Sequence, residues 1–340
     1  MVLTEVAFAG SDGVYTIDPD TVPEIALNPA EQSYGPLARY SFRSFGIRDA
    51  AARGKLVVAV GTYEGRSVLG VSSNGKDVPR TLRVPALDRA AGSTEQALTD
   101  VAFVPGKDLL VARHADGPLA IWSTRTWKLV NTIEVGQGSG LAVHGRQALV
   151  LEEGAGEGPR LVLADLTTGT TRAAAAPGAE RIAWSHDGSR IAVLGGDSTV
   201  RYRNAGLKET GEPLVLPGTT ERPTALALAP DGRHVAVAAG DEVLVHDTAT
   251  GLQALPTLHS SRGQRITRLA WSPDGHFLAG VTSPVDSGEA PGPVSLWRVD
   301  GIDWRNQVCR WTGGAGLSTK EWRTHIGERH AYTDLCAETK

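Results

Sequence analysis

The chain has 340 residues, among them 40 glycines and 19 prolines, and its formal net charge is −4. This weak negative charge predicts no strong attraction to nucleic acid or to an anionic membrane surface, and no apolar run approaches the length that crosses a bilayer. Residues 1–5 have neither the basic start nor the apolar stretch of a signal peptide. We therefore expect a cytoplasmic protein. The frequent turn residues and the 41% apolar content are typical of an all-β fold with a large core.

The first 90 residues contain short apolar segments in an irregular pattern. Residues 6–18 can be read as the second and third strands of a sheet whose first strand is absent, whereas residues 3–8 equally resemble a first strand. The sequence does not choose between these two readings. Four further segments predict one four-stranded sheet, at residues 42–47, 56–60, 67–71 and 81–84.

From residue 100 onward the chain repeats one phrase, an alanine between two apolar residues, followed by a turn. The phrase stands at Val101–Phe103, Leu141–Val143, Ile182–Trp184, Leu226–Leu228 and Leu269–Trp271. Its alanines are 40 to 44 residues apart. Self-similarity at this period is typical of a β-propeller, in which four-stranded sheets, the blades, pack side by side around an axis. The units predict an all-β, seven-bladed propeller of four-stranded antiparallel blades with a short α-helical C-terminal tail.

The turn that follows three of these strands has a defined chemistry. Ser272–Gly275 reads Ser-Pro-Asp-Gly, and residues 185–188 and 229–232 are close variants of it. Proline presets φ, aspartate caps its own backbone and glycine accepts a positive φ. With these features residues 43–299 resemble the WD-repeat β-propeller family, in which this turn joins the first two strands of each blade.

The resemblance is incomplete at the third strand of each blade. The Trp-Asp dipeptide that closes this strand in the family is nowhere intact, and its place is held by Trp122-Ser123, Ala164-Asp165, Tyr202-Arg203, His246-Asp247 and Trp297-Arg298. The family's Gly-His pair before the first strand is also missing. We therefore expect degenerate blades that are held together mainly by apolar packing between sheets.

The predicted ring is short of strands at both ends, because the last blade also lacks an obvious fourth strand. An open sheet edge is an aggregation hazard, and propellers usually avoid it by pairing the two chain ends in one blade. Either the termini share a blade here, or the chain is the C-terminal piece of a longer protein. In both cases residues 1–300 are expected to form the propeller and residues 301–340 a helical tail.

The tail replaces the strand pattern by a helical one. Residues 302–311 place apolar side chains at helical spacing, and Gly313–Gly316 ends that segment. Ser318 and Glu321 have the spacing of a capping box, which predicts a short helix to about residue 327. The apolar stripes of the two segments predict that the tail packs on the outer flank of the last blade.

The tail also resembles the ending of a group of signalling proteins. The residues that carry this resemblance are Trp304, Cys309-Arg310, Leu317-Ser318, Glu321-Trp322, and Tyr332 with Cys336. Large actinobacterial-type signalling proteins end in this way, with a WD-repeat propeller behind a STAND-type NTPase, protease or other effector domain. The resemblance implies that the propeller senses a ligand or partner while an upstream effector domain acts. The 340 residues contain no pattern of such an effector domain, which leaves open whether the chain is a fragment or a stand-alone relative.

The chain has two cysteines, Cys309 and Cys336. A disulfide between them would tie the end of the tail to its first helix and would stabilise the fold by roughly 3 kcal/mol. A cytosolic location favours free thiols instead. His325 and His330 lie between the cysteines, so a metal site is a third alternative, although the spacing fits no regular zinc finger. All three alternatives stay open.

No motif in the chain predicts catalysis or a cofactor. The glycine clusters at residues 136–140 and 154–158 lack the Lys-Ser/Thr ending of a P-loop. Three local pairs combine an imidazole with a carboxylate: His114 with Asp116, His186 with Asp187, and His276 with Asp274. All three lie in turns or hairpins, where these residues commonly shape the loop. We therefore expect a protein that is not an enzyme and that binds no metal or other cofactor.

The candidate interface is the turn that holds Trp127, with Arg125 and Lys128 beside it, because tryptophan and arginine dominate interface energetics. The alternative is that the Trp127 ring packs on the adjacent blade. We expect a non-catalytic protein- or ligand-binding propeller, the sensor of a bacterial signalling or defence system, whose partner is a protein or an upstream effector domain. A propeller hydrolase with a metal site at the channel mouth is the alternative function. The oligomeric state is not predicted.

Overall fold

The structure is a computed structural model, which describes the chain over part of its length. The described residues are 6–8, 13–16, 21–28, 33–41, 45–53, 56–63, 66–73, 80–82, 98–114, 117–154, 156, 158–216, 221–261, 263–284, 294–299 and 318–325. Side chains are described at most, but not all, of these positions from residue 49 onward. The chain divides into two compact units, Met1–Trp297 and Arg298–Lys340.

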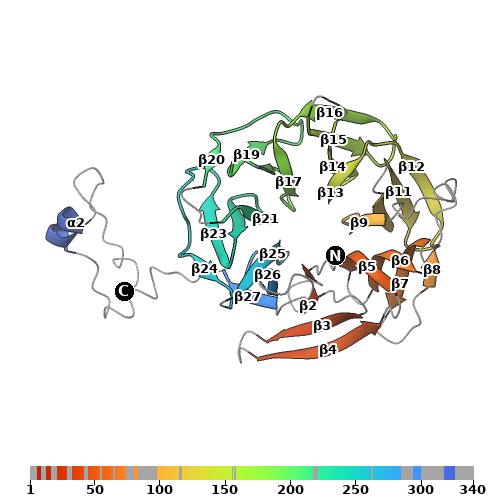
Figure 1. Cartoon of the computed structure of the whole chain (residues 1–340), viewed down its shortest axis with the longest axis horizontal. Coiled ribbons are helices and arrows are strands. Elements are labelled where there is room, and N and C mark those ends of the chain that lie inside the picture. Colours follow the sequence, from red (N-terminus) through yellow and green to blue (C-terminus); the bar gives the residue numbers. More distant parts are fainter. Residues whose placement is uncertain are drawn as a thin grey trace. The chain divides into compact units, whose positions relative to one another are not determined.

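The first unit consists of antiparallel sheets whose strands follow one another in chain order (Figure 1). The first three sheets contain β1 (Val6–Phe8), β2 (Gly13–Thr16), β3 (Thr21–Asn28) and β4 (Ser33–Ser41); β5 (Phe45–Arg53), β6 (Leu56–Tyr63), β7 (Arg66–Ser73) and β8 (Arg80–Leu82); and β9 (Leu98–Phe103), β10 (Leu109–His114), β11 (Gly117–Ser123) and β12 (Leu129–Ile133). The next three contain β13 (Gly138–His144), β14 (Gln147–Glu152), β15 (Arg160–Asp165) and β16 (Thr171–Ala175); β17 (Ala179–Trp184), β18 (Ile191–Gly195), β19 (Thr199–Arg203) and β20 (Leu214–Val215); and β21 (Pro223–Leu228), β22 (His234–Ala239), β23 (Glu242–Asp247) and β24 (Leu258–His259). The last sheet contains β25 (Gln264–Trp271), β26 (Phe277–Pro284) and β27 (Val294–Arg298).

The described residues form six four-stranded blades and one sheet of three strands, so the prediction of seven four-stranded blades is wrong. Among the described residues the last sheet has three strands, because no described strand follows β27. The N-terminus does not supply the missing strand, since β1 pairs with β2 in the register Val6↔Thr16 to Phe8↔Val14. In the described part of the chain, the two ends therefore do not share a blade.

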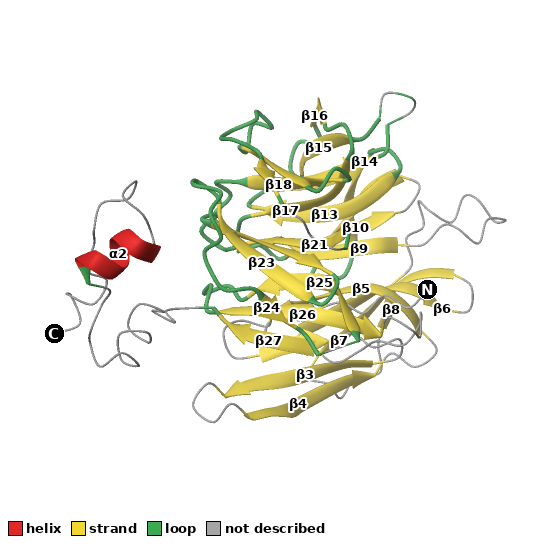
Figure 2. Ribbon diagram, turned by 60° about the vertical axis from the view of Figure 1, so that its left-hand side comes forward, coloured by secondary structure: helices red, strands yellow, loops and turns green. Residues whose placement is uncertain are grey.

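The ring closes by packing between sheets. Each first strand lies against the first strand of the next sheet, from β5 through β9, β13, β17 and β21 to β25, and β1 lies against both β5 and β25. The strand β1 thus takes the position of a first strand, which decides between the two readings of the N-terminus. Residues 21–41, where the sequence pattern predicts no strand, form β3 and β4 as a long hairpin (Figure 2).

The core lies between neighbouring blades. The second strands of the blades are the most buried, and Ile191–Gly195 is buried at every position, because each such strand has a sheet packed against both of its faces. One apolar cluster joins Val104 and Ile121 of one blade to Val150 and Val162 of the next. Burial of a side chain of this size contributes about 1.5–3 kcal/mol. Apolar packing between sheets therefore holds the ring, as the sequence predicts.

The Ser-Pro-Asp-Gly turn is confirmed between β25 and β26. The Ser272 hydroxyl donates to Asp274 Oδ1 at 2.5 Å, and the same oxygen accepts the His276 N–H at 2.9 Å. Gly275 has a φ of +77°, which an L side chain would oppose. Ser185 and Asp187 make the corresponding bond, at 2.7 Å, between β17 and β18. These carboxylates therefore shape turns, as expected of aspartate at this position.

Tyr202 takes the place of the tryptophan that the WD-repeat family carries at the end of the third strand. It is 2% exposed, and its hydroxyl has no hydrogen-bond partner among the described residues. Burial raises the pKa of Tyr202 to about 12, with Arg190 acting in the opposite direction. The Arg190 guanidinium lies over the Tyr202 ring at 5.3 Å from its centre.

We expect Tyr202→Phe to be at least as stable as the wild type at pH 7, because it removes a buried polar atom that has no partner. The raised pKa means that the folded state keeps the phenolic proton between about pH 10 and 12, whereas the unfolded chain loses it. Wild-type stability therefore falls as the pH rises through this window, and the variant lacks that loss. Urea unfolding should show its advantage growing by about 1–3 kcal/mol between pH 9 and 12. An advantage of equal size at both pH values would contradict the buried state of this phenol.

The described helix of the second unit is α2 (Thr319–His325). Its predicted capping box is confirmed: Glu321 Oε2 accepts the Ser318 N–H at 2.8 Å, and Ser318 Oγ accepts the Glu321 N–H at 3.3 Å. The helix is short, at seven residues. The helical segment predicted at residues 302–311 lies outside the described residues, and the packing of the tail on the last blade stays a prediction.

Candidate functional sites

The two ends of each blade carry different loops. One end holds the starts of the first strands and the turns between second and third strands, and we call it the strand-start face. The other end holds the turns between first and second strands and between third and fourth strands, and we call it the strand-end face. Because successive strands are antiparallel in every blade, this assignment follows from strand order alone.

The Trp127 turn lies on the strand-end face, between β11 and β12. Trp127 donates its N–H to the Ser123 carbonyl at 2.7 Å, and Gly169 and Gly251 make the same bond in other blades, at 2.9 Å. Both glycines have a positive φ, and so does Trp127, at +54°. A bulky residue in this left-handed region is strained, at a cost of roughly 1–2 kcal/mol. Trp127 thus occupies a position where two equivalent turns use glycine.

The three residues of the candidate interface differ in their environment. The Trp127 ring is half-buried and packs against the apolar cluster that joins the blade β5–β8 to the blade β9–β12. Arg125 is exposed and binds Asp108 at 2.6 Å, and Lys128 is exposed. Packing against this cluster therefore accounts for the half-buried state of the ring. A role for these residues in binding a partner stays a proposal.

We expect Trp127→Gly to be more stable than Trp127→Ala by about 1 kcal/mol, because glycine takes a positive φ without penalty. Both variants lose the packing of the ring against the apolar cluster, so both should be less stable than the wild type. Val215 in β20 is the matched control, since it is exposed and pairs regularly with Thr199 in the β19–β20 ladder. At this control position the glycine variant should be less stable than the alanine variant, by about 0.5–1 kcal/mol. Urea unfolding of the four variants measures this, and the same order at both positions would contradict the strained turn.

A buried arginine joins two blades in a place where the sequence predicts no site. Arg113 in β10 is 0% exposed. It donates to three carbonyl oxygens of the next blade and its leading loop: Gly140 at 2.9 Å, Leu151 at 3.1 Å and Gly136 at 3.2 Å. Burial lowers the pKa of Arg113, and the nearby carboxylates of Asp100 and Glu152 oppose this shift. The guanidinium therefore holds the blade β13–β16 against its neighbour.

Glu152 continues this polar cluster toward the surface. Its side chain is 3% exposed. One carboxylate oxygen accepts the Gly136 N–H at 2.6 Å, and the other accepts Nε–H of Arg160, also at 2.6 Å. Glu152 and Arg160 are directly opposite in the β14–β15 ladder. Each oxygen of the buried Glu152 carboxylate accepts a short hydrogen bond, so this carboxylate is well satisfied. Its hydrogen bond to Nε fixes the orientation of the Arg160 guanidinium.

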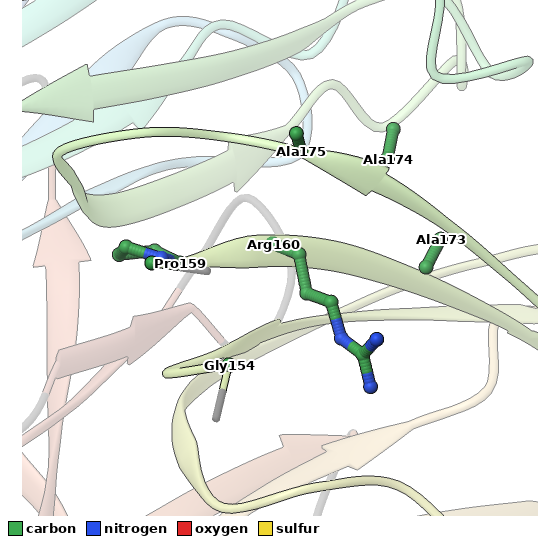
Figure 3. Close-up of a pocket in the computed structure, with 7 residues that line it drawn as sticks. Gly154, Pro159, Arg160, Ala173, Ala174 and Ala175 are labelled. Carbon is green, nitrogen blue, oxygen red and sulfur yellow. The ribbon is translucent and has the colours of Figure 1, made fainter. Parts of the chain in front are cut away.

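Two cavities on the strand-start face share the side chain of Arg160. The larger has a volume of about 450 Å³ and is lined by Gly154, Gly158, Pro159, Arg160 and Ala173–Ala175 (Figure 3). The smaller has about 380 Å³, and its charged lining residues are Glu134, Glu152, Arg160 and Arg172. In Figure 3 Arg160 extends from β15, and the three alanines follow one another along β16.

Ion pairs between blades mark the inner part of the same face. Glu180 pairs with Arg222, and Glu221 pairs with Arg265 at 2.9 Å. We call these four residues the ion-pair rim. Two further arginines lie in the first strands nearby, namely Arg181 in β17 and Arg268 in β25. Burial lowers the pKa of Arg181, and the charge of Arg268 adds to this shift. Among the described residues neither arginine lies within ion-pair distance of a carboxylate.

The remaining candidates from the sequence do not form a site. Asp187 and Asp274 bind their own turns, as given above, and Asp116 lies outside the described residues. Within the described ranges no three His, Cys, Asp or Glu side chains are grouped so that they could hold a metal ion. Cys309 and Cys336 also lie outside the described residues, so the disulfide, the free thiols and the metal site stay predictions.

A comparison with protein families supports the fold. The family described as "WD domain, G-beta repeat" matches residues 253–284, which run from the end of the blade β21–β24 through β26. The blades and this repeat together support a WD-repeat β-propeller, a class whose members are generally non-enzymatic and mediate contacts between proteins. No curated protein matches the chain. Among the helices in the described part of the chain, none has the length and apolarity of a membrane span.

Proposed function

We propose that this protein is a non-catalytic interaction module that binds a protein partner on its strand-start face. The observation that carries the proposal is the pair of arginines, Arg181 and Arg268, in the first strands beside the ion-pair rim. Arg181 and Arg268 stand beside the ion-pair rim without carboxylate partners among the described residues. Guanidinium groups of this kind suit carboxylates on a partner surface, because they form directional, charge-assisted hydrogen bonds. We therefore infer a partner with an acidic surface.

The finer role follows from the resemblance of the tail. We infer that the propeller is the sensor of a bacterial signalling or defence system, with the acidic surface belonging to a separate protein or to an upstream effector domain. A sensor of this kind needs a broad, preformed surface rather than catalytic groups, and loops on a rigid array supply one. The Trp127 turn on the strand-end face is the second candidate surface.

Three charge-reversed variants separate the two faces. Arg181→Glu with Arg268→Glu changes the strand-start face, Arg125→Glu with Lys128→Glu changes the Trp127 turn, and Arg233→Glu is the matched control. Arg233 follows the turn between β21 and β22 and has a side chain that is 80% exposed. The measurement is quantitative affinity capture from the cells that encode the chain, with each variant compared with the wild type.

We expect the first variant to lose at least tenfold of a partner that the wild type and Arg233→Glu retain. A partner lost with the Arg125 and Lys128 variant instead would move the interface to the strand-end face. Equal recovery by all variants, or the absence of any enriched partner, would overturn the proposed function.

A further inference from the structure

Arg160 is anchored at Nε by a buried carboxylate, although much of its side chain is exposed. Its Nε is held by the buried carboxylate of Glu152 at 2.6 Å, whereas its side chain as a whole is 49% exposed. Among the described residues no acceptor lies within hydrogen-bond distance of its two terminal nitrogens. The guanidinium is thus anchored through Nε, and Arg160 lines both cavities.

The anchor itself is rigid. Glu152 is fixed by the Gly136 N–H on its other oxygen, and Arg113 lies behind it with three hydrogen bonds to backbone carbonyls. An arginine whose fork is pre-oriented loses less side-chain freedom when it binds an anion. The charge of Arg160 is partly balanced by Glu152, and Arg113 contributes a second positive charge beneath the pair. The carboxylates of Asp100 and Glu153 also act on Arg113, so the cluster has no excess of positive charge, and Arg160 offers a ligand directional hydrogen bonds rather than net charge.

The larger cavity is lined mainly by small residues, which leave room for a ligand. Gly154, Gly158, Pro159 and the alanines of β16 leave about 450 Å³ beside Arg160, a volume in the range of small-molecule sites. Among the described lining residues Arg160 is the one that carries a charge. Proline and alanine offer apolar contact, and the fixed guanidinium offers two parallel N–H donors to a carboxylate.

We propose that this cavity binds a small organic acid, with its carboxylate on the terminal nitrogens of Arg160 and its apolar part against Pro159, Ala173 and Ala175. A dianionic phosphate fits less well, since Glu134 and Glu152 line the adjoining cavity that shares Arg160. Glu152 is a positioning residue in this site. The site lies apart from the ion-pair rim, so it does not depend on the proposed protein partner.

The test uses benzoate as the probe, with benzamide as its neutral counterpart and inorganic phosphate as the competing anion. Binding to the full chain is followed by calorimetric titration and by chemical-shift changes in the probe. We expect saturable binding of benzoate, at least tenfold weaker binding of benzamide, and weaker binding of phosphate. Saturable binding of phosphate that is tighter than that of benzoate would overturn the ligand class, and no saturable binding of benzoate would overturn the site.

Three variants locate the probe. Arg160→Met should weaken benzoate binding at least tenfold, and Arg160→Lys should weaken it less, because the charge remains but the planar fork is lost. Ala173→Phe, at an exposed position that lines both cavities, should block binding while Arg160 stays in place. Arg233→Gln is the control and should bind like the wild type. Thermal unfolding of each variant verifies the fold, and unchanged affinity in the folded Arg160→Met and Ala173→Phe proteins would contradict the proposal.

Discussion

Replacement of Arg113 by methionine is expected to lower the free energy of unfolding by about 3–5 kcal/mol, a range typical of breaking a buried charged network. Methionine fills a similar volume, so the loss comes from charge and hydrogen bonding rather than from a cavity. Three carbonyl oxygens, of Gly136, Gly140 and Leu151, lose their donor. Glu152 also loses a positive neighbour while it remains buried.

Urea unfolding at pH 7 measures this loss, with Arg233→Met as the matched control. Arg233 is 80% exposed and its distance to Asp231 is 3.8 Å, and surface pairs of this kind contribute little. Its replacement should change the stability by less than about 0.5 kcal/mol. A loss below about 1 kcal/mol for Arg113→Met would show that the guanidinium is not needed to join the two blades.

Local patterns in the sequence were sufficient for the parts of the fold that depend on neighbouring residues. The turn at Ser272–Gly275 and the capping box of Ser318 and Glu321 are confirmed because their hydrogen bonds link residues at most five positions apart. The alanine period identifies the blades for a similar reason, since each repeat is one local unit. Strands that break the pattern were missed: β3 and β4 contain Pro23 and Pro36, and proline weakens any strand prediction.

The polar cluster could not be predicted in the same way. In the sequence Arg113 stands near the end of an apolar strand. The three carbonyl oxygens that accept its hydrogen bonds belong to residues 23 to 38 positions away, in the next blade and its leading loop. One signal was present, because a hairpin between β14 and β15 places Glu152 opposite Arg160. The glycine cluster at residues 136–140 is a loop only at its start, because Gly138–Gly140 already belong to β13, so the loop prediction was wrong there. The proximity of this cluster to Arg113 depends on packing between blades.

Gly138→Ala is expected to lower the free energy of unfolding by more than about 3 kcal/mol, because two effects add. Gly138 has a φ of +150°, and a Cβ there would meet the carbonyl oxygen of Leu151 and lie 2.8 Å from the Glu152 Cα. These are backbone atoms of β14, so relief would require the two strands to separate. Gly145→Ala is the control, since its φ is +57° but nothing lies within 4 Å of the added carbon.

The control should lose about 1 kcal/mol, from the backbone conformation alone. The difference between the two glycines in urea unfolding therefore isolates the contact with β14. The same added carbon would lie 3.1 Å from an Nη atom of Arg113, so the two sites should be coupled. In an Arg113→Met background Gly138→Ala should cost less, by about 0.5–3 kcal/mol, as expected for residues that share partners. Strict additivity would mean that the glycine and the arginine act on this blade junction independently.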